Sequence, residues 1–212
     1  LEDLQEITLM LEALELAGML LEESNNYEEA LGFYNKELFI EQKRNDSAGI
    51  LDASRDIAYA YYLWEEYDSA LVFYNSALRI ANQLRDRGAR AGILNDMGNI
   101  YLSWGNYHKS LDFYREALNI CRDIGDSVGI SKAFNNIGII YFDWKEWDKS
   151  LEYYQLSFEV DSLMNNTIGQ AQTLNNIAII YDETGDDEKA LRVYNRSLKL
   201  AEEAGNDYQI AV

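Results

Sequence analysis

Residues 86–125 read DRGARAGILNDMGNIYLSWGNYHKSLDFYREALNICRDIG, and the chain carries this 40-residue pattern five times without insertion or deletion. The repetition appears as columns of residues spaced 40 apart. One column is tyrosine in every copy: Tyr34, Tyr74, Tyr114, Tyr154 and Tyr194. Another is always Gly or Ala: Gly18, Ala58, Gly98, Gly138 and Ala178. A strict period of this length predicts a solenoid, in which each repeat packs only on its neighbours.

Each repeat reads as two amphipathic helices joined by a tight turn. Within residues 86–125, two blocks place apolar residues three and four apart, which is the spacing of a helix with one buried face. Gly105 and Gly125 suit the left-handed backbone that ends a helix, and Asn106 and Asp126 can cap the next one. We expect first helices near 7–23, 47–64, 87–104, 127–144 and 167–184, and second helices near 27–43, 67–84, 107–124, 147–164 and 187–204.

The unbroken period favours one continuous all-α array over residues 1–212. Its repeats would cover 7–45, 46–85, 86–125, 126–165 and 166–205, and residues 206–212 would begin a further helix. The chain opens at Leu1 without a Met, inside a helical pattern. We therefore expect it to be a fragment of a longer protein.

Composition and charge exclude several classes of partner. The formal net charge is -19, so a nucleic acid backbone or an anionic membrane would be repelled. No apolar run is long enough to span a membrane, and no secretory signal is visible. We expect a cytoplasmic protein, the alternative being a periplasmic one if a signal segment was removed from the fragment.

The residues that could carry chemistry are few. His108 is the only histidine and has no companion with metal-ligand spacing, so we interpret it as a solvated surface residue. Cys121 lies in a column with Ala81 and Ala201 and is interpreted as a small packing residue. We predict no catalytic residue, no metal and no cofactor. A tryptophan column, Trp64, Trp104 and Trp144, either packs between repeats or forms an aromatic ladder for a ligand.

The columns resemble the tetratricopeptide repeat. Leu94, Met97-Gly98, Tyr101, Ser110 and Tyr114 follow the family's order of a large apolar residue, Leu-Gly, Tyr, Ala and an aromatic residue. The period of 40 and the absence of proline resemble the longer repeats of kinesin light chains, of Pins-type adaptors and of bacterial signalling arrays. The resemblance implies a right-handed superhelix whose first helices line a concave groove that binds peptides without catalysis.

Asparagines recur in the middle of the first helices, where asparagine is otherwise unfavourable. In the resembled family these positions face the groove and hydrogen-bond the main chain of a bound peptide. The alternative is that the side chains bridge neighbouring repeats. The implied groove residues are Arg55, Tyr59, Tyr62, Asn95, Asn99, Lys132, Asn135, Asn136, Phe142, Asn175 and Asn176.

These features predict a non-catalytic scaffold that binds a protein or peptide partner carrying apolar and basic residues. Two alternatives remain open. The first is a sensor or regulatory array of a larger signalling protein, such as a kinase or a transcription regulator. The second is a structural solenoid that assembles into a homo-oligomer through its terminal repeats.

Overall fold

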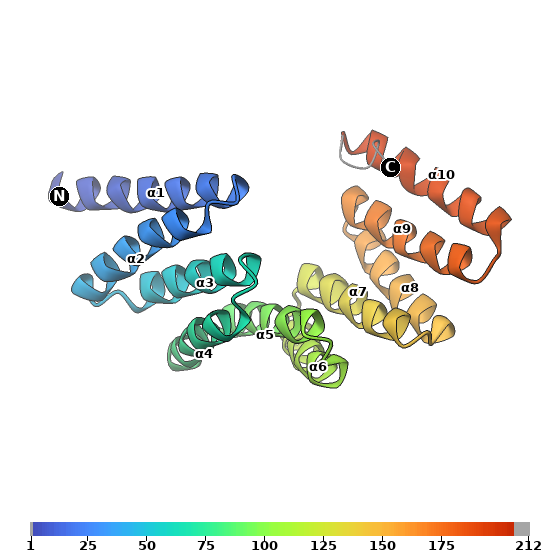
Figure 1. The fold of residues 1–212 in the computed structure, drawn as a ribbon, viewed down its shortest axis with the longest axis horizontal. Helices are drawn as coiled ribbons and strands as arrows, with labels where there is room; N and C mark the ends of the chain where they lie inside the picture. The colour runs from blue at the N-terminus through green and yellow to red at the C-terminus, as the bar shows by residue number, and fades with distance from the viewer. Residues whose placement is uncertain (1, 206–212) are drawn as a thin grey trace. The chain divides into compact units, whose positions relative to one another are not determined.

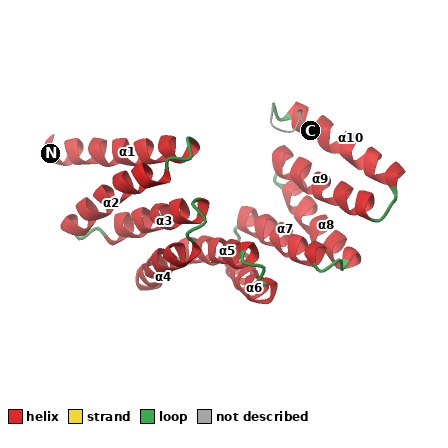
Figure 2. Ribbon diagram, in the orientation of Figure 1, coloured by secondary structure: helices red, strands yellow, loops and turns green. Residues whose placement is uncertain are grey.

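The structure is a computed structural model that describes the backbone of residues 2–205 and the side chains of residues 5–205. These residues form ten helices joined by short turns, with no strand among them (Figures 1 and 2). The first helices of the five pairs are α1 (Glu2–Glu23), α3 (Ser47–Leu63), α5 (Arg87–Ser103), α7 (Ser127–Asp143) and α9 (Thr167–Glu183). The second helices are α2 (Tyr27–Arg44), α4 (Tyr67–Leu84), α6 (Tyr107–Ile124), α8 (Trp147–Leu163) and α10 (Asp187–Glu203).

The all-α repeat fold is therefore confirmed. Nine helices begin at the predicted residue and end within one residue of the predicted end, whereas α1 begins at Glu2 rather than near residue 7. The further helix expected over 206–212 lies outside the described residues. The chain forms two compact units, Leu1–Ile100 and Tyr101–Val212. That all five repeats form one continuous array stays a prediction.

The backbone conformation of the turns depends on the position in the repeat and not on the type of residue there. The column that contains Gly125, which was predicted to be left-handed, has positive φ in every repeat, including Asn45 at 56°, Arg85 at 57° and Gly125 at 72°. A second column, within each pair, contains Glu65 at 64° and Lys145 at 59°. A non-glycine residue in this conformation costs free energy. The packing of the helix pair therefore dictates the turn even where the residue does not favour it.

The N-caps predicted at Asn106 and Asp126 form, and other residues in the column of Asp126 are N-caps as well. The Asp46 side chain accepts from the backbone N–H groups of Ala48 and Gly49 at 3.1 and 3.2 Å, and Asp126 accepts from Gly129 at 3.0 Å. Asp86 and Asn166 cap α5 and α9 in the same way. Asn206, the fifth member of this column, lies outside the described residues.

The small column lets the two helices of a pair approach closely. A Cβ added to Gly138 would lie 2.6 Å from the ring of Tyr154, and one added to Gly18 would lie 2.4 Å from the ring of Tyr34. Tyr34 and Tyr154 are 1% and 2% exposed, so each ring fills the space that the missing side chain leaves. In these two repeats a tyrosine packs closely on a small residue of the preceding helix, within a core that also contains Leu and Ile side chains.

Candidate functional site

In the first unit, α3 carries an aromatic pair on its surface. Tyr59 is 46% exposed, although its neighbours Ala58 and Ala60 are fully buried. The Tyr62 ring lies 6.2 Å from the Tyr59 ring, and its other side faces Tyr67 at 6.1 Å. The predicted residues Tyr59 and Tyr62 therefore form one half-exposed aromatic surface.

Two predicted asparagines of this unit, Asn95 and Asn99, lie on α5 and are both half-buried. Each already takes part in an interaction within the chain. Arg55, on α3, is half-buried as well, and its Nη2 lies 3.5 Å from the position that a Cβ on Gly92 would take. The Arg55 guanidinium is therefore directed toward α5.

In the second unit, one predicted pair forms a bridge between repeats. The Asn176 Nδ2 donates to Asn135 Oδ1 at 2.9 Å, which joins α9 to α7. The bridging alternative thus holds for these two side chains. Asn136 is engaged within the chain, Asn175 is half-buried and Lys132 is exposed. Binding of a peptide main chain by these residues stays a prediction.

Phe142, predicted as an apolar anchor, is partly occupied by its own unit. Its ring lies 5.3 Å from the Trp147 ring in an edge-to-face arrangement, and it packs against the core cluster of Tyr154, Leu174, Ile177 and Ile180. Phe142 is half-buried and therefore offers less free surface than Tyr59.

A buried hydroxyl site connects the repeats of the second unit. Ser157, on α8, is 1% exposed and donates to the backbone carbonyl of Ser131 at 3.0 Å. Its Oγ also lies 3.0 Å from the Ser131 hydroxyl and 3.4 Å from that of Thr173. Ser197 in the next repeat repeats the motif by donating to the Ala171 carbonyl at 2.7 Å. Ser157 and Ser197 thus occupy the same column, and both are small, buried and hydrogen-bonded.

The column that contains Ser157 and Ser197 also holds a carboxylate, which was not predicted from the sequence. The residues are Glu37, Ala77, Ala117, Ser157 and Ser197, so a glutamate replaces a small residue in the first repeat alone. Glu37 is only 8% exposed, and its Oε2 has no hydrogen-bond partner. The outlier in an otherwise small column is the signal that could have identified it.

Further carboxylates surround Glu37. We call Glu15, Glu22, Glu37, Asp52 and Asp56 the carboxylate cluster; they come from α1, α2 and α3. Burial, followed by the charges of Asp56 and Glu15, raises the pKa of Glu37 to about 7. Burial, followed by the charge of Glu15, raises the pKa of Asp56 to about 6. The like charges therefore reinforce the effect of burial.

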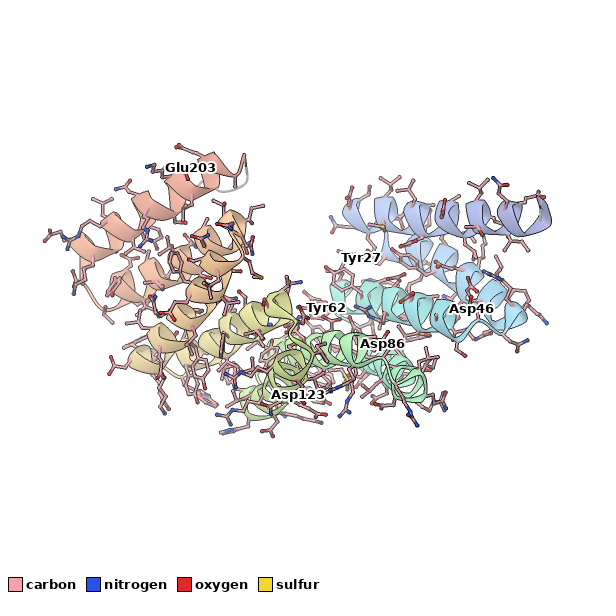
Figure 3. All side chains as sticks on the ribbon, turned by 180° about the vertical axis from the view of Figure 1, so that it is seen from behind. Tyr27, Asp46, Tyr62, Asp86, Asp123 and Glu203 are labelled. Atoms are coloured by element: carbon pink, nitrogen blue, oxygen red, sulfur yellow. The ribbon has the colours of Figure 1, made fainter. Side chains whose placement is uncertain are left out.

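Glu22 extends the carboxylate cluster toward Tyr34. Burial raises the pKa of Glu22 to about 7, and a hydrogen bond with Tyr34 opposes that rise. The Oε1 atom of Glu22 has no hydrogen-bond partner. Figure 3 shows the side chains on α1, α2 and α3 around the labelled Tyr27, Tyr62 and Asp46.

The candidates for enzyme or metal chemistry remain isolated. Burial and the neighbouring Asp126 carboxylate raise the pKa of the Cys121 thiol to about 11, which suppresses the nucleophilic thiolate. Cys121 packs against Gly129, where a Cβ would lie 2.4 Å from its sulfur, in keeping with a packing role. His108 is exposed and lies against Trp144, with ring centroids 5.1 Å apart. The described side chains contain no group of three or more His, Cys, Asp and Glu residues that could hold a metal ion.

The tryptophan column belongs mainly to local packing. Trp144 is half-buried and contacts Tyr107 and Tyr141 edge-to-face, with centroids 6.4 and 5.5 Å away. Trp64 and Trp104 are each 43% exposed and lie against Tyr61 and Tyr101. Each ring contacts a tyrosine of its own helix pair, and Trp144 also packs between repeats through Tyr107 of α6.

The family model for the Tetratricopeptide repeat matches three overlapping segments of the chain, residues 49–123, 89–162 and 129–203. No curated protein matches the sequence. Within residues 2–205, no helix is long and apolar enough to cross a membrane.

Solved structures share the fold at low sequence identity. A Rap protein complexed with Competence and Sporulation Factor is 19% identical with a TM-score of 0.82, covering 95% of this chain and 56% of that chain. A STAND protein with a tetratricopeptide repeat sensor, from Pyrococcus horikoshii, is 22% identical with a TM-score of 0.75, covering 91% and 30%. A putative kinesin light chain from Podosopora anserina is 11% identical with a TM-score of 0.71, covering 92% and 96%. The chain thus spans about half of the Rap protein and less than a third of the STAND protein.

Proposed function

Because the chain belongs to the tetratricopeptide repeat family, we propose that it is a non-catalytic interaction module that binds a segment of a partner protein. The partner would lie on the face that the first helices carry. We assign to this face Tyr59 and Tyr62 in the first unit and Asn135, Phe142 and Asn175 in the second, all of which lie on first helices. We further propose that the five repeats form one array.

One observation carries this proposal: the half-exposed pair of Tyr59 and Tyr62 on α3. A soluble helix normally presents polar side chains to water, whereas interfaces are enriched in tyrosine, which gives a large contact area at low conformational cost. The next first helix in sequence order carries Asn95 and Asn99, so the predicted face combines aromatic and amide groups. That combination suits a peptide whose side chains anchor on the rings.

The structural neighbours support a peptide or protein partner. The Rap structure holds Competence and Sporulation Factor, and a second Rap structure, of the plasmid pLS20, holds the Phr* peptide. Since these proteins share the fold at about 20% identity, the ligand itself does not transfer to this chain. What the neighbours support is the class of partner.

The proposal can be tested by selecting peptides that bind the immobilised chain from a displayed random library. Affinities are then measured by calorimetry. Tyr59→Ala should weaken binding by about 1–3 kcal/mol, because truncation of an interface aromatic commonly has this cost. Phe39→Ala is the matched control, since Phe39 is 59% exposed but lies on the second helix α2. Equal losses from both variants, or no selected peptide at all, would overturn the proposal.

The asparagines are tested with the same peptides. Asn135→Ala combined with Asn175→Ala should weaken binding by about 1–3 kcal/mol if each side chain contributes one neutral hydrogen bond to the peptide. Unchanged affinity together with a lowered melting temperature would show that these residues only join repeats. The bond between Asn135 and Asn176 makes a stability loss expected in either case, so affinity is the deciding measurement.

A second candidate function is self-assembly through the ends of the chain. Among the described side chains of α1, five large apolar ones are exposed, and α10 exposes Leu191 and Leu198. The exposed residues of α1 are Leu9, Met10, Leu16, Met19 and Leu20. Head-to-tail contact of these two helices would bury them. Light scattering over a concentration series should show a constant monomer mass if the chain acts as an interaction module, and a rising mass if it assembles.

A role as the sensor of a larger signalling protein is compatible with the interaction module. The STAND neighbour carries its repeats as a sensor within a longer chain. The sequence of the full-length gene decides this possibility, because an attached kinase, ATPase or transcription module would be directly visible.

A further inference from the structure

The carboxylate cluster of the first unit is the most unusual electrostatic feature of the described side chains. It contains Glu37, which is more than nine-tenths buried and has an oxygen without a hydrogen-bond partner. Burying a carboxylate without a partner costs several kcal/mol at order of magnitude. A chain that retains such a group at a position where its other repeats carry Ala or Ser keeps it at a cost in stability.

The side chains of the carboxylate cluster range from exposed to buried. Glu15 and Asp52 are exposed, Glu22 and Asp56 are half-buried, and Glu37 is buried. A cation at the surface would therefore be attracted by the exposed carboxylates and by the buried Glu37 beneath them. The attraction of a buried charge is stronger because less water screens it.

Of the cations on the neighbouring helices, those of α2 are engaged elsewhere and only Arg55 of α3 acts on the cluster. On α2, Lys36 and Lys43 lie over the rings of Phe33 and Phe39, and Arg44 pairs with Glu41 at 2.8 Å. On α3, Arg55 lowers the pKa values of Asp52 and Asp56 but is directed toward Gly92 of α5. The carboxylate cluster thus carries an excess of negative groups over the one cation that faces it.

The repeat itself shows what this position does elsewhere. Asn135 and Asn176, which hydrogen-bond to each other, occupy the columns of Glu15 and Asp56. Two amides close that inter-repeat position in the second unit, whereas two carboxylates repel each other in the first. A guanidinium or ammonium group placed between two carboxylates would restore what the amide pair achieves.

From these observations we propose that the carboxylate cluster is a recognition site for an arginine or lysine side chain of the bound partner segment. The inference rests on the proposed function, since it names what one part of the interaction face recognises. A basic side chain fits better than a metal ion, because the carboxylates are not grouped as metal ligands. It also fits the exposed Tyr59 ring, because burial and then the charge of Glu22, a member of the cluster, raise the pKa of the Tyr59 hydroxyl.

The test uses the full chain and the peptides selected by display. We expect a basic residue to recur among them, and we expect its replacement by citrulline, a neutral isostere of arginine, to weaken binding at least tenfold. The chain with Glu37→Gln and Asp56→Asn should lose this discrimination to less than twofold. Asp182→Asn is the matched control, because Asp182 shares the column of Glu22 but lies on α9, and it should keep the full discrimination.

A second readout separates the cluster from general charge attraction. Blocked arginine, N-acetyl-arginine methylamide, should shift the carboxyl NMR signals of Glu37 and Asp56, and the citrulline analogue should not. At neutral pH, calorimetry in buffers of different ionisation enthalpy should show proton release with the arginine peptide, and a smaller release from the Glu37→Gln chain, in which Glu22 and Asp56 still titrate. Circular dichroism melting confirms that each variant is folded.

The outcomes distinguish the two proposals. Peptides that bind on the Tyr59 face but tolerate citrulline would overturn the cation site and leave the proposed function standing. Shifts from blocked arginine without any selected peptide would support the cation site and overturn the proposed function. Equal loss of discrimination in the Asp182→Asn control would overturn the cation site, because bulk charge would then explain the preference.

Discussion

The two units build the same helix pairs but treat the polar positions between repeats differently. In the second unit, the Asn176–Asn135 bond and the Ser157 hydroxyl satisfy these positions from within the chain. In the first unit, the matching positions hold Glu15, Asp56 and Glu37, whose charges repel one another. The second unit therefore satisfies, from within the chain, positions at which the first unit carries carboxylates of like charge.

Helix packing is the feature that the two units share, so its loss should have the largest effect in both. Gly138→Leu and Gly18→Leu would each drive a side chain into the tyrosine ring that now lies in its place. We expect a loss of about 1–3 kcal/mol or more in the free energy of unfolding, from overpacking. Denaturant unfolding followed by far-UV circular dichroism measures it.

Gly32→Leu is the control for these variants. Nothing lies within 4 Å of a Cβ added to Gly32, which is an exposed residue of α2. Its substitution should leave the denaturant midpoint unchanged or raise it, since leucine favours helix over glycine. Coinciding midpoints for Gly138→Leu and the parent would refute the role of the small column.

The stability of the first unit should depend more strongly on pH than that of the second unit. The folded-state pKa values of Glu22 and Glu37 are raised from 4.5 to about 7 and that of Asp56 from 3.8 to about 6. The folded chain thus holds protons that the unfolded chain has released, and the stabilisation, complete at acidic pH, is lost as the pH rises through these values. We expect the first unit to lose about 1–3 kcal/mol between about pH 5 and pH 8, since each pKa unit is worth about 1.4 kcal/mol before solvent screening.

Amide hydrogen exchange read by mass spectrometry at the two pH values resolves this effect by segment. Protection of α1, α2 and α3 should fall at the higher pH after correction for the intrinsic exchange rate. Protection of α7, α8 and α9 should change less, because their inter-repeat positions carry amides and hydroxyls. A uniform change over both units would contradict the comparison.

The amide bridge of the second unit should have a smaller, local effect. A double-mutant cycle with Asn135→Ala and Asn176→Ala should give a coupling energy of about 0.5–1.5 kcal/mol, the value of a neutral hydrogen bond. Asn175→Ala paired with Asn135→Ala serves as the control cycle. Additive effects in the first cycle would show that the bond contributes nothing measurable to stability.

Sequence reasoning predicted the helices well because each boundary is encoded by a local rule repeated five times. Caps such as Asp46 and Asp126 bond to backbone groups within three residues. Arg85 does not favour a left-handed turn by itself, but the Asn and Gly residues at the same position in other repeats predict one there. The close approach at Gly138 was also predictable, since a small residue recurs opposite an invariant tyrosine. The family resemblance agrees with the family match of residues 49–203.

The site was harder to predict because its features lie in departures from the columns. The bond between Asn135 and Asn176 joins residues 41 positions apart, one more than the period, so reading down a single column does not pair them. Glu37 stands alone among small residues, and its burial depends on three helices together. A search for charged outliers in small columns would have identified it from sequence. Paired substitutions in two columns can be found in the same way. Cys121 packs against Gly129 and Asp161 packs against Gly169, so a larger residue in one column is matched by a glycine in the other. In the second repeat the same two columns hold Ala81 and Ala89.

The central claim is that the first unit holds a buried carboxylate at a cost in stability, and the Glu37→Gln variant tests it most directly. The measurement is the difference in free energy of unfolding between variant and parent at about pH 8 and about pH 5. We predict that the variant is more stable by about 1–2 kcal/mol at pH 8, where Glu37 is ionised, and nearly equal at pH 5, where it is protonated. A variant that is less stable than the parent by the same amount at both pH values would contradict this account.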